Sequence, residues 1–238
     1  MLCLSIGDFA RGWPGYEWRW RREGEQQPRE FTQPQWRGET LTGKTILLHA
    51  EQGFGDSIQF VRYLPMVAMK GGKIILELPD GLRPLIEKMK DVDGTFRRGD
   101  PLPQFDVHCP LLSLPLAFGT TIDTIPAPVP YLHAPADRAQ AWRARLAGVR
   151  RPRIGLVWSG KPTHKNDHNR SIALSRLEPL LSAGGVEFVS LQREYRESRR
   201  LNGCRSSAWI SWSPTLPRLQ RRSAISTSSS QSIPQSLT

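Results

Sequence analysis

Segments with the character of buried strands alternate with amphipathic segments along this chain. Residues 44–49 form an apolar run bounded by Gly43, and a glycine-containing turn follows them. The next segment, 57–69, predicts a helix because it repeats apolar residues at helical spacing. The apolar residues on that face are Ile58, Val61, Leu64 and Val67. The same order recurs at 73–78 and 82–90, and such alternation predicts an α/β fold whose parallel sheet is covered on both faces.

A second series of the same kind begins near residue 151. Residues 153–158 resemble a buried strand that ends in a Ser-Gly turn, 174–181 a helix and 186–191 a further strand. Four prolines between residues 126 and 135 punctuate the connection between the two series. The sequence therefore predicts two Rossmann-like parallel-sheet halves, the second of them incomplete.

These patterns divide the chain into four regions. Residues 1–36 form a helical, aromatic arm, in which tryptophan and tyrosine side chains recur three to five positions apart. Residues 37–137 form the first Rossmann-like domain, and 138–197 begin the second. Residues 198–238 form a tail that we expect to be non-native or disordered.

The tail differs from the rest of the chain in composition. Residues 198–238 contain twelve Ser and six Arg but no Asp or Glu. A low-complexity linker has this composition. A shifted reading frame near Arg199 has the same effect, because the frame one base earlier lets residues 222–238 encode a turn, a buried strand and an Asp-Thr…His turn. The frameshift is the hypothesis that we favour for the tail, and a genuine low-complexity linker is the alternative.

The net charge and the cysteine content limit the kinds of function that the protein could have. The net charge is +11, but residues 1–197 carry 27 basic and 22 acidic side chains, so the body is only +5. That balance suits a protein that binds a phosphorylated small molecule as well as it suits a nucleic-acid binder. Because no recognition motif accompanies the arginines of the tail, we expect no nucleic-acid partner. The three cysteines lie far apart, which favours a reducing cytoplasm. No apolar run is long enough to span a membrane, and no signal peptide is visible.

The first candidate site is the turn at the carboxyl end of the first strand. Ligands of open α/β sheets bind at such strand ends. Gly53 and Gly55 allow a ligand to approach the backbone, and Gln52 lies beside them. Asp56 lies where the next helix begins. Its carboxylate can cap that helix, or it can act as a general base because it is ionised at neutral pH.

The second candidate site is the loop after the strand 153–158. The loop contains basic and hydroxyl side chains that could bind a diphosphate. Its candidate residues are Ser159, Gly160, Lys161, His164, Asn166, Asp167, Arg170 and Ser171. A solvated charged loop is the alternative interpretation. No metal is expected, because His164 and His168 lack the Glu of a zinc-binding H-E-x-x-H helix. His49, within the first strand, is interpreted as a hydrogen-bonded core residue and not as a ligand.

Five stretches together resemble bacterial TPR-linked glycosyltransferases of the heptosyltransferase-like GT-B group. The stretches are 16–19 (Tyr-Glu-Trp-Arg), 43–56, 111–120, 155–160 and 190–192 (Ser-Leu-Gln). The resemblance covers about residues 5 to 197. It implies two Rossmann-like domains with a cleft between them, the first binding the acceptor and the second the nucleotide-sugar.

The resemblance also implies residue roles. Asp56 matches the catalytic base of that group, and residues 159–161 and 164–171 match its diphosphate-binding region. The implied reaction is an inverting, metal-independent transfer of a sugar from a nucleotide-sugar to a glycan, lipid or protein hydroxyl, with no bound cofactor. The upstream TPR helices of that group would give protein partners. The group's D-T-x-x-A-H turn is absent in this reading frame, which predicts an impaired donor site.

Three other hypotheses remain open at this stage. A non-catalytic scaffold would use the arm to bind partners and retain the second half only as a remnant. A nucleotide-dependent oxidoreductase would bind NAD, although the turn 51–57 lacks the third glycine of a dinucleotide fingerprint. A nucleic-acid binder would depend on the arginines of the tail.

Overall fold

The structure is a computed structural model that describes residues 2–21, 28–148, 151–160, 162–182, 184–192 and the backbone of Trp209–Ser211. The chain divides into two compact units, Met1–Ala139 and Gln140–Thr238. Apart from Trp209–Ser211, the predicted tail 198–238 lies outside the described residues. Each unit is described by itself below.

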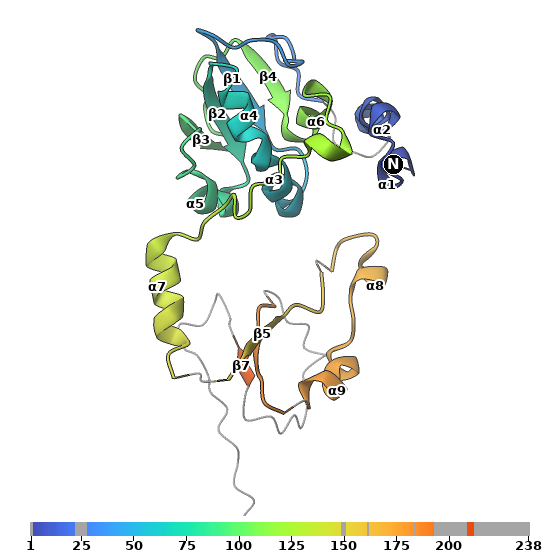
Figure 1. Ribbon diagram of the computed structural model, residues 1–238, viewed down its shortest axis with the longest axis vertical. Coiled ribbons are helices and arrows are strands. Elements are labelled where there is room, and N and C mark those ends of the chain that lie inside the picture. Colours follow the sequence, from blue (N-terminus) through green and yellow to red (C-terminus); the bar gives the residue numbers. More distant parts are fainter. Residues whose placement is uncertain are drawn as a thin grey trace, which may run out of the picture. The chain divides into compact units, whose positions relative to one another are not determined.

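Unit 1 contains a four-stranded sheet in which all strands run parallel. The strands are β1 (Thr45–His49), β2 (Lys73–Leu78), β3 (Gly94–Arg97) and β4 (Val107–Pro110). Their order is β3-β2-β1-β4, with β1 and β2 at the centre (Figure 1). The predicted α/β class and parallel sheet are therefore confirmed for this unit. The short strand β3 was not expected, because its four residues include glycine, threonine and arginine and show no apolar run.

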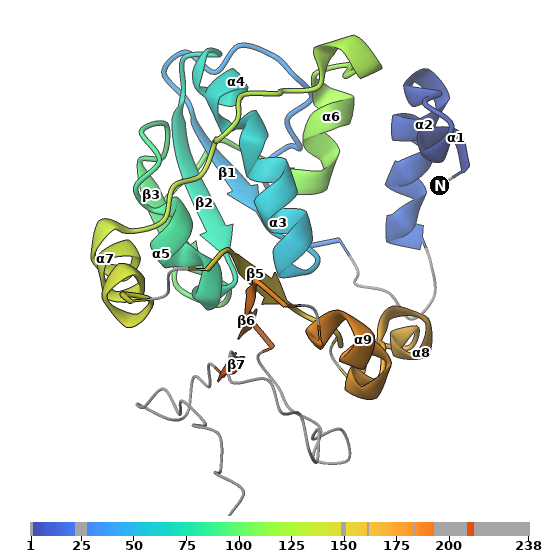
Figure 2. The same ribbon diagram turned by 60° about the horizontal axis from the view of Figure 1, so that its bottom comes forward.

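Helices cover one face of this sheet (Figure 2). They are α3 (Phe54–Phe60), η2 (Val61–Tyr63), α4 (Leu64–Ala68), η3 (Asp80–Leu82), α5 (Arg83–Ile86), η4 (Leu111–Ser113) and α6 (Leu114–Ala117), with η5 (Ile122–Thr124) beyond them. Alternate strand residues such as Ile46, Leu48 and Leu76 meet Val61 and Leu64 in the main apolar core. These contacts bury the helical face that the spacing in 57–69 predicted.

Proline divides the predicted helices into short pieces. Segment 57–69 is not one helix, because the 3-10 turn η2 interrupts it before α4. Pro65 lies in the first turn of α4, where its missing N–H leaves no helical hydrogen bond unmade. Pro84 and Pro115 occupy the same place in α5 and α6, and each of those helices also follows a 3-10 turn.

An extended segment covers the opposite face of the sheet. Residues 28–36, called the strap below, pass beside β4, where Gln35 bridges to His108 in parallel. Trp36 donates its backbone N–H to His108 O at 2.7 Å, and His108 donates its own to Pro34 O at 3.1 Å. The connection 98–106 from β3 to β4 contains no helix and includes two prolines. Both faces are thus covered as predicted, but in the part of the chain that the structure describes, helices cover only one of them.

Polar side chains lie under the strap. His49 in β1 is 2% exposed, and its Nε2 lies 3.3 Å from Nδ1 of His108. Glu77 in β2 pairs with Arg29 of the strap. The ring centroid of Phe31 lies 4.7 Å from that of His108 and 5.5 Å from that of His49. The prediction that His49 is a hydrogen-bonded core residue is confirmed.

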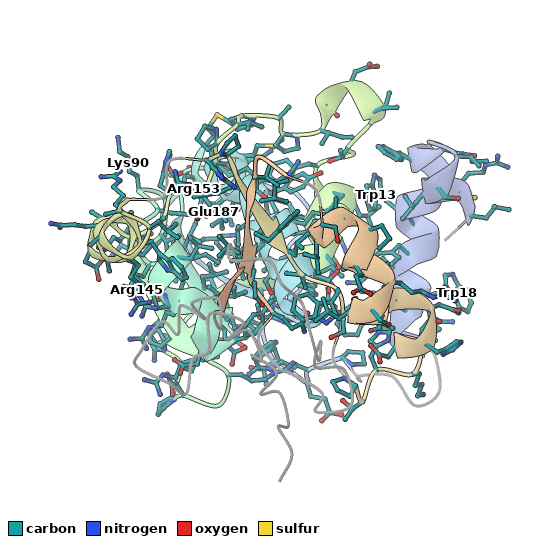
Figure 3. The ribbon with its side chains drawn as sticks, turned by 90° about the horizontal axis from the view of Figure 1, so that it is seen from below. Trp13, Trp18, Lys90, Arg145, Arg153 and Glu187 are labelled. Carbon is teal, nitrogen blue, oxygen red and sulfur yellow. The ribbon has the colours of Figure 1, made fainter. Side chains whose placement is uncertain are left out.

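Of the residues 1–36 assigned to the arm, 28–36 form the extended strap and 2–21 form three short helical segments, to which the word arm refers below. They are α1 (Leu2–Ser5), α2 (Phe9–Tyr16) and the 3-10 helix η1 (Glu17–Arg21). Asp8 caps α2 by accepting the N–H of Arg11 at 3.2 Å. Trp13 lies on the side of the arm toward α6, whereas Trp18 points away from the unit and is largely exposed (Figure 3). Trp13 donates its Nε1–H to Thr120 O at 2.9 Å, which fixes the arm to the segment after α6.

Unit 2 contains a smaller parallel sheet. Its strands β5 (Arg153–Leu156), β6 (Glu187–Ser190) and β7 (Trp209–Ser211) lie in that order, and Figure 3 labels Arg153 and Glu187 on neighbouring strands. The helices are α8 (Asp167–Arg170), η6 (Leu174–Leu177) and α9 (Glu178–Leu181), while α7 (Ala136–Arg145) crosses from unit 1. Trp158, Leu174, Leu181 and Phe188 form its core. Among the described residues, no helix has the length and apolar character to cross a bilayer.

The histidines under the strap predict a pH dependence of stability. Burial, and then the neighbouring His108 and arginines, lower the pKa of His49 to about 3. In the unfolded chain the pKa is about 6.5, so the unfolded state takes up the proton first as the pH falls. The neutral state of buried His49 therefore contributes to the free energy of unfolding. This contribution is fully present above pH ~6.5 and decreases toward pH ~3, by up to about 1.4 kcal/mol per pH unit.

Two measurements check this expectation. Two-dimensional NMR should show His49 neutral at pH 5, and urea unfolding should show a stability loss between pH 6.5 and 5 that the His49→Asn variant reduces. An unstructured histidine peptide gives the reference titration. A midpoint for His49 near that of the peptide would contradict the buried, neutral state.

Candidate functional site

The turn after β1 is built around the start of helix α3. Gly53 is the extended N-cap residue, and Asp56 accepts its backbone N–H through Oδ2 at 3.0 Å. Ser57 donates its hydroxyl to Gly53 O at 3.2 Å. The prediction that Asp56 is itself the N-cap residue is wrong, because α3 begins at Phe54 and Asp56 is its third residue. From there its carboxylate still stabilises the helix start, by accepting the N–H of the N-cap residue Gly53. The half-buried carboxylate lies just beyond the carboxyl end of β1.

The neighbouring candidates differ in how closely they are packed. A Cβ on Gly53 would lie 3.3 Å from Oδ2 of Asp56, so a side chain there would crowd the capping carboxylate. A Cβ on Gly55 would meet no described atom within 4 Å, so the surrounding structure leaves room for a side chain at that position. Gln52 is exposed and donates its amide to the hydroxyl of Tyr16 at 3.5 Å, a long hydrogen bond.

Under the turn, a buried ion pair joins the arm to the sheet. Arg19 of η1 is 8% exposed and Glu51 is 5% exposed. Arg19 Nη2 donates to Glu51 Oε1 at 2.9 Å, and Arg19 Nε donates to Oε2 at 3.2 Å, which makes the pair bidentate. Burial raises the pKa of Glu51, and the hydrogen bonds from Arg19 oppose that rise. The arginine thus opposes, without cancelling, the effect of burial on the pKa of the carboxylate at the base of the turn.

Further hydrogen bonds close this ion pair into a network. Arg19 also donates to Ser113 Oγ at 2.8 Å and to Glu17 Oε1 at 2.6 Å. Ser113 donates to Glu17 at 2.9 Å, and the backbone N–H of Leu112 donates to Glu51 at 3.3 Å. The network therefore connects η1, the end of β1 and η4.

Aromatic side chains of the arm enclose the guanidinium. Cζ of Arg19 lies 4.5 Å from the ring centroid of Trp20 and 4.9 Å from that of Tyr16. Burial raises the pKa of Tyr16, and the carboxylates of Glu51 and Asp56 contribute to that rise. Tyr16 therefore lies close enough to the turn for these two carboxylates to affect the pKa of its hydroxyl. Apart from the aromatic and charged run itself, nothing in the sequence predicts this arrangement.

Phe54 forms a second contact that the sequence did not predict. It is 43% exposed and lies at the start of α3. A Cβ on Gly81 would lie 2.9 Å from Cζ of Phe54, so glycine at 81 makes room for the ring. A shallow pocket of about 520 Å³ opens beside it, lined by η3, α5, Pro135 and Arg138. This pocket lies at the same strand edge as the turn.

The second candidate loop follows β5 and is held by a glutamine. Gln192, just after β6, accepts the backbone N–H groups of Trp158 and Ser159 at 3.2 and 3.1 Å. Its own amide donates to Ser159 O at 3.0 Å. Ile172 donates its N–H to Trp158 O at 2.8 Å, which closes the loop at its base. In the sequence, Gln192 belongs only to the stretch 190–192 of the resemblance, and its three hydrogen bonds to the loop follow from the tertiary structure.

Two candidates in this loop bind each other. Ser171 donates its hydroxyl to Oδ1 of Asp167 at 2.6 Å and accepts the N–H of Gly160 at 3.0 Å. Asp167 is buried, and a Cβ on Gly160 would lie 3.3 Å from its Oδ1. The contacts among Gly160, Asp167 and Ser171 therefore hold the two ends of the loop together.

The other candidates of the loop point to its exposed side. His164 Nδ1 accepts the N–H of Asn166 at 3.1 Å, and Asn166 accepts the amide of Asn169 at 2.7 Å. His164, Asn166 and Arg170 are exposed. Lys161 lies outside the described residues. In the described part of the chain, no three His, Cys, Asp or Glu side chains gather closely enough to hold a metal ion.

The structure brings the candidates together in two groups. Gln52, Gly53, Gly55 and Asp56 share one turn of unit 1. The described candidates of the second loop share one loop of unit 2. Each group lies after the first strand of a parallel sheet. Fold and sites together define an α/β protein with polar, glycine-containing loops at the carboxyl ends of parallel strands.

Comparison with known proteins adds one relative. The chain is 26% identical over 211 residues to Protein FlbA of Caulobacter vibrioides, a match that covers 80% of this chain and 35% of FlbA. The chain thus spans about a third of the length of that relative. No protein-family model matches the chain, and no solved structure matches it.

The buried ion pair predicts a large effect of a single substitution. Arg19→Met leaves the Glu51 carboxylate buried without its partner, and we expect a loss of about 3–5 kcal/mol in the free energy of unfolding. Urea unfolding followed by tryptophan fluorescence measures it.

The matched control is Arg21→Met in the same 3-10 helix, which alters an exposed arginine stacked on Trp18 and should cost less than about 0.5 kcal/mol. The double variant Arg19→Met/Glu51→Leu should recover much of the lost stability. Equal effects of the two arginine substitutions would show that the buried pair does not hold the arm.

Proposed function

We propose that the protein belongs to an inverting, metal-independent class of glycosyltransferase, with acceptor activation assigned to unit 1 and binding of the donor diphosphate to unit 2. The observation that carries the proposal is the repeated placement of a glycine-containing polar loop after the first strand of each parallel sheet. Ligands of α/β sheets bind at these strand ends. The resemblance in residues 43–56, 155–160 and 190–192 supports the same assignment.

In this proposal Asp56 is the general base. Oδ2 accepts the N–H of Gly53, which leaves Oδ1 to take the proton of an acceptor hydroxyl. The acceptor oxygen then forms a bond to the anomeric carbon of the donor sugar. The bond from that carbon to the nucleoside diphosphate breaks, and its electron pair leaves with the diphosphate. Attack from the face opposite the leaving group inverts the anomeric centre.

Side chains, rather than backbone amides, would bind the departing diphosphate. The amides of Trp158, Ser159 and Gly160 already donate within the loop. The exposed cations Lys165 and Arg170 and the exposed imidazole of His164 lie on the same loop and remain available for phosphate oxygens. Such groups stabilise the negative charge that develops on the leaving group.

The Asp56→Asn variant tests the role of Asp56 as a general base separately from its hydrogen bond to the N-cap residue. The asparagine side chain retains an oxygen that can accept the N–H of Gly53, so the free energy of unfolding should change by less than about 0.5 kcal/mol. The rate of sugar transfer should fall about 100- to 10,000-fold, because the amide cannot accept the proton. The assay uses a panel of nucleoside-diphosphate sugars with the full chain and with a chain whose codons after 198 are returned to the earlier frame.

Asp91→Asn is the matched control, since it neutralises a carboxylate away from the turn and should leave transfer unchanged. Unaltered transfer in Asp56→Asn would refute the assignment of the base. Transfer restored by the earlier frame and absent in the present one would support the proposed frameshift.

Nucleoside-diphosphate binding tests the role of the second loop. Isothermal titration of the frame-restored chain with UDP, GDP and ADP should detect one of the three, and Arg170→Met should weaken its binding about 10- to 100-fold. The matched control Arg176→Met changes an exposed arginine in the following 3-10 helix and should leave the affinity unchanged.

A partner-binding scaffold is the second candidate function. The arm exposes the apolar side chains of Leu2, Ile6 and Trp18, which could contact another protein. A folded, frame-restored chain that binds none of the three nucleotides and transfers no sugar would favour this function over the first.

A further inference from the structure

Two buried polar atoms on the strap side of the sheet have no hydrogen-bond partner within the described structure. They are Nδ1 of His49 and Oε1 of Glu77. His49 and Glu77 are register partners on the neighbouring parallel strands β1 and β2, about 4.8 Å apart across the sheet. At 2% and 1% exposed, both side chains are cut off from bulk water.

The remaining polar atoms of the two side chains are already engaged. Glu77 pairs through Oε2 with Arg29 of the strap, and His49 contacts His108 through Nε2. Phe31 of the strap lies against both imidazoles, and Cζ of Arg29 lies 4.5 Å from its ring centroid. The carboxylate charge is thus balanced by Arg29, and the two open positions do not require another ion.

The chemistry of the two free atoms defines what fits between them. Oε1 of the paired Glu77 carboxylate can only accept a hydrogen bond, so the occupant must donate one. Nδ1 of a neutral imidazole either accepts or donates, depending on the tautomer. A hydroxyl group satisfies both atoms when Nδ1 carries the imidazole proton, because it then accepts from Nδ1 and donates its one hydrogen to Oε1. In the other tautomer both atoms accept, and only a water molecule, which has two hydrogens, satisfies both. Each buried atom left unpaired would otherwise cost about 1–3 kcal/mol.

We propose that His49 and Glu77 form a binding site for one neutral hydroxyl group, enclosed beneath the strap. A water molecule is the smallest source of that group. A hydroxyl of a small polyol is the other, and it would reach the site when Arg29 releases Glu77 and the strap opens. The site lies toward the carboxyl ends of β1 and β2, the edge at which α/β sheets bind ligands. It does not depend on the proposed transferase activity.

A high-resolution crystal structure of the full chain, grown without polyols, tests the site directly. The expected result is an isolated oxygen about 2.6–3.2 Å from both His49 Nδ1 and Glu77 Oε1. A second crystal, soaked in glycerol, distinguishes the sources: additional carbon density continuous with that oxygen identifies a polyol, and an unchanged isolated oxygen identifies water. Absence of any oxygen, or a direct hydrogen bond between the two side chains, would overturn the proposal.

Two isosteric variants separate this site from a purely structural role of His49. The amide of His49→Asn can occupy the place of Nδ1 but cannot reach His108, whereas that of His49→Gln can occupy the place of Nε2. The bound oxygen should persist in His49→Asn and disappear in His49→Gln. The reverse pattern, or persistence in both, would show that Nδ1 does not bind the hydroxyl.

NMR of the full chain gives the same answer in solution if crystals do not form. A long-lived water should give nuclear Overhauser contacts to the imidazole protons of His49 in the wild type and to the amide protons of Asn in His49→Asn. No such contact in polyol-free or glycerol-containing buffer would overturn the proposal.

Discussion

The bidentate pair of Arg19 and Glu51 is the interaction on which the architecture of unit 1 depends. Arg19 belongs to the arm, and Glu51 follows the central strand β1 directly. Both groups are buried, so each needs the other to remain charged without a large desolvation penalty. Through Ser113 and Leu112 the same pair reaches the end of β4. The arm is therefore an integral part of the strand edge that holds the candidate turn.

The sheet of unit 1 has two unlike faces. Short helices with a proline in the first turn pack aliphatic side chains against one face, while the strap covers histidine, glutamate and arginine side chains on the other. The difference follows from the connection 98–106, which returns to β4 without a helix. Buried polar groups remain on that face because they pair with one another and with Arg29.

The sequence predicted the candidate turns well because their position follows from local patterns. An apolar run that ends in glycine and is followed by helical spacing fixes where a strand-end loop must be, as at Gly53 and Gly160. It could not show that Asp167, Ser171 and Gly160 bind one another, since those bonds depend on how the loop folds back. Nor could it show the clamp by Gln192, which lies 33 and 34 residues along the chain from its partners.

By itself, the amino-acid sequence determined the α/β class and the parallel sheet of unit 1 apart from its edge strand β3, because hydrophobic period and turn residues are local properties. Only the tertiary structure decided which face the helices cover, that the arm is locked to β1, and that His49 lies opposite Glu77. These features arise from contacts between residues distant in sequence, such as Arg19 with Glu51 and Arg29 with Glu77. Burial makes such pairs strong, and burial exists only once the chain has folded.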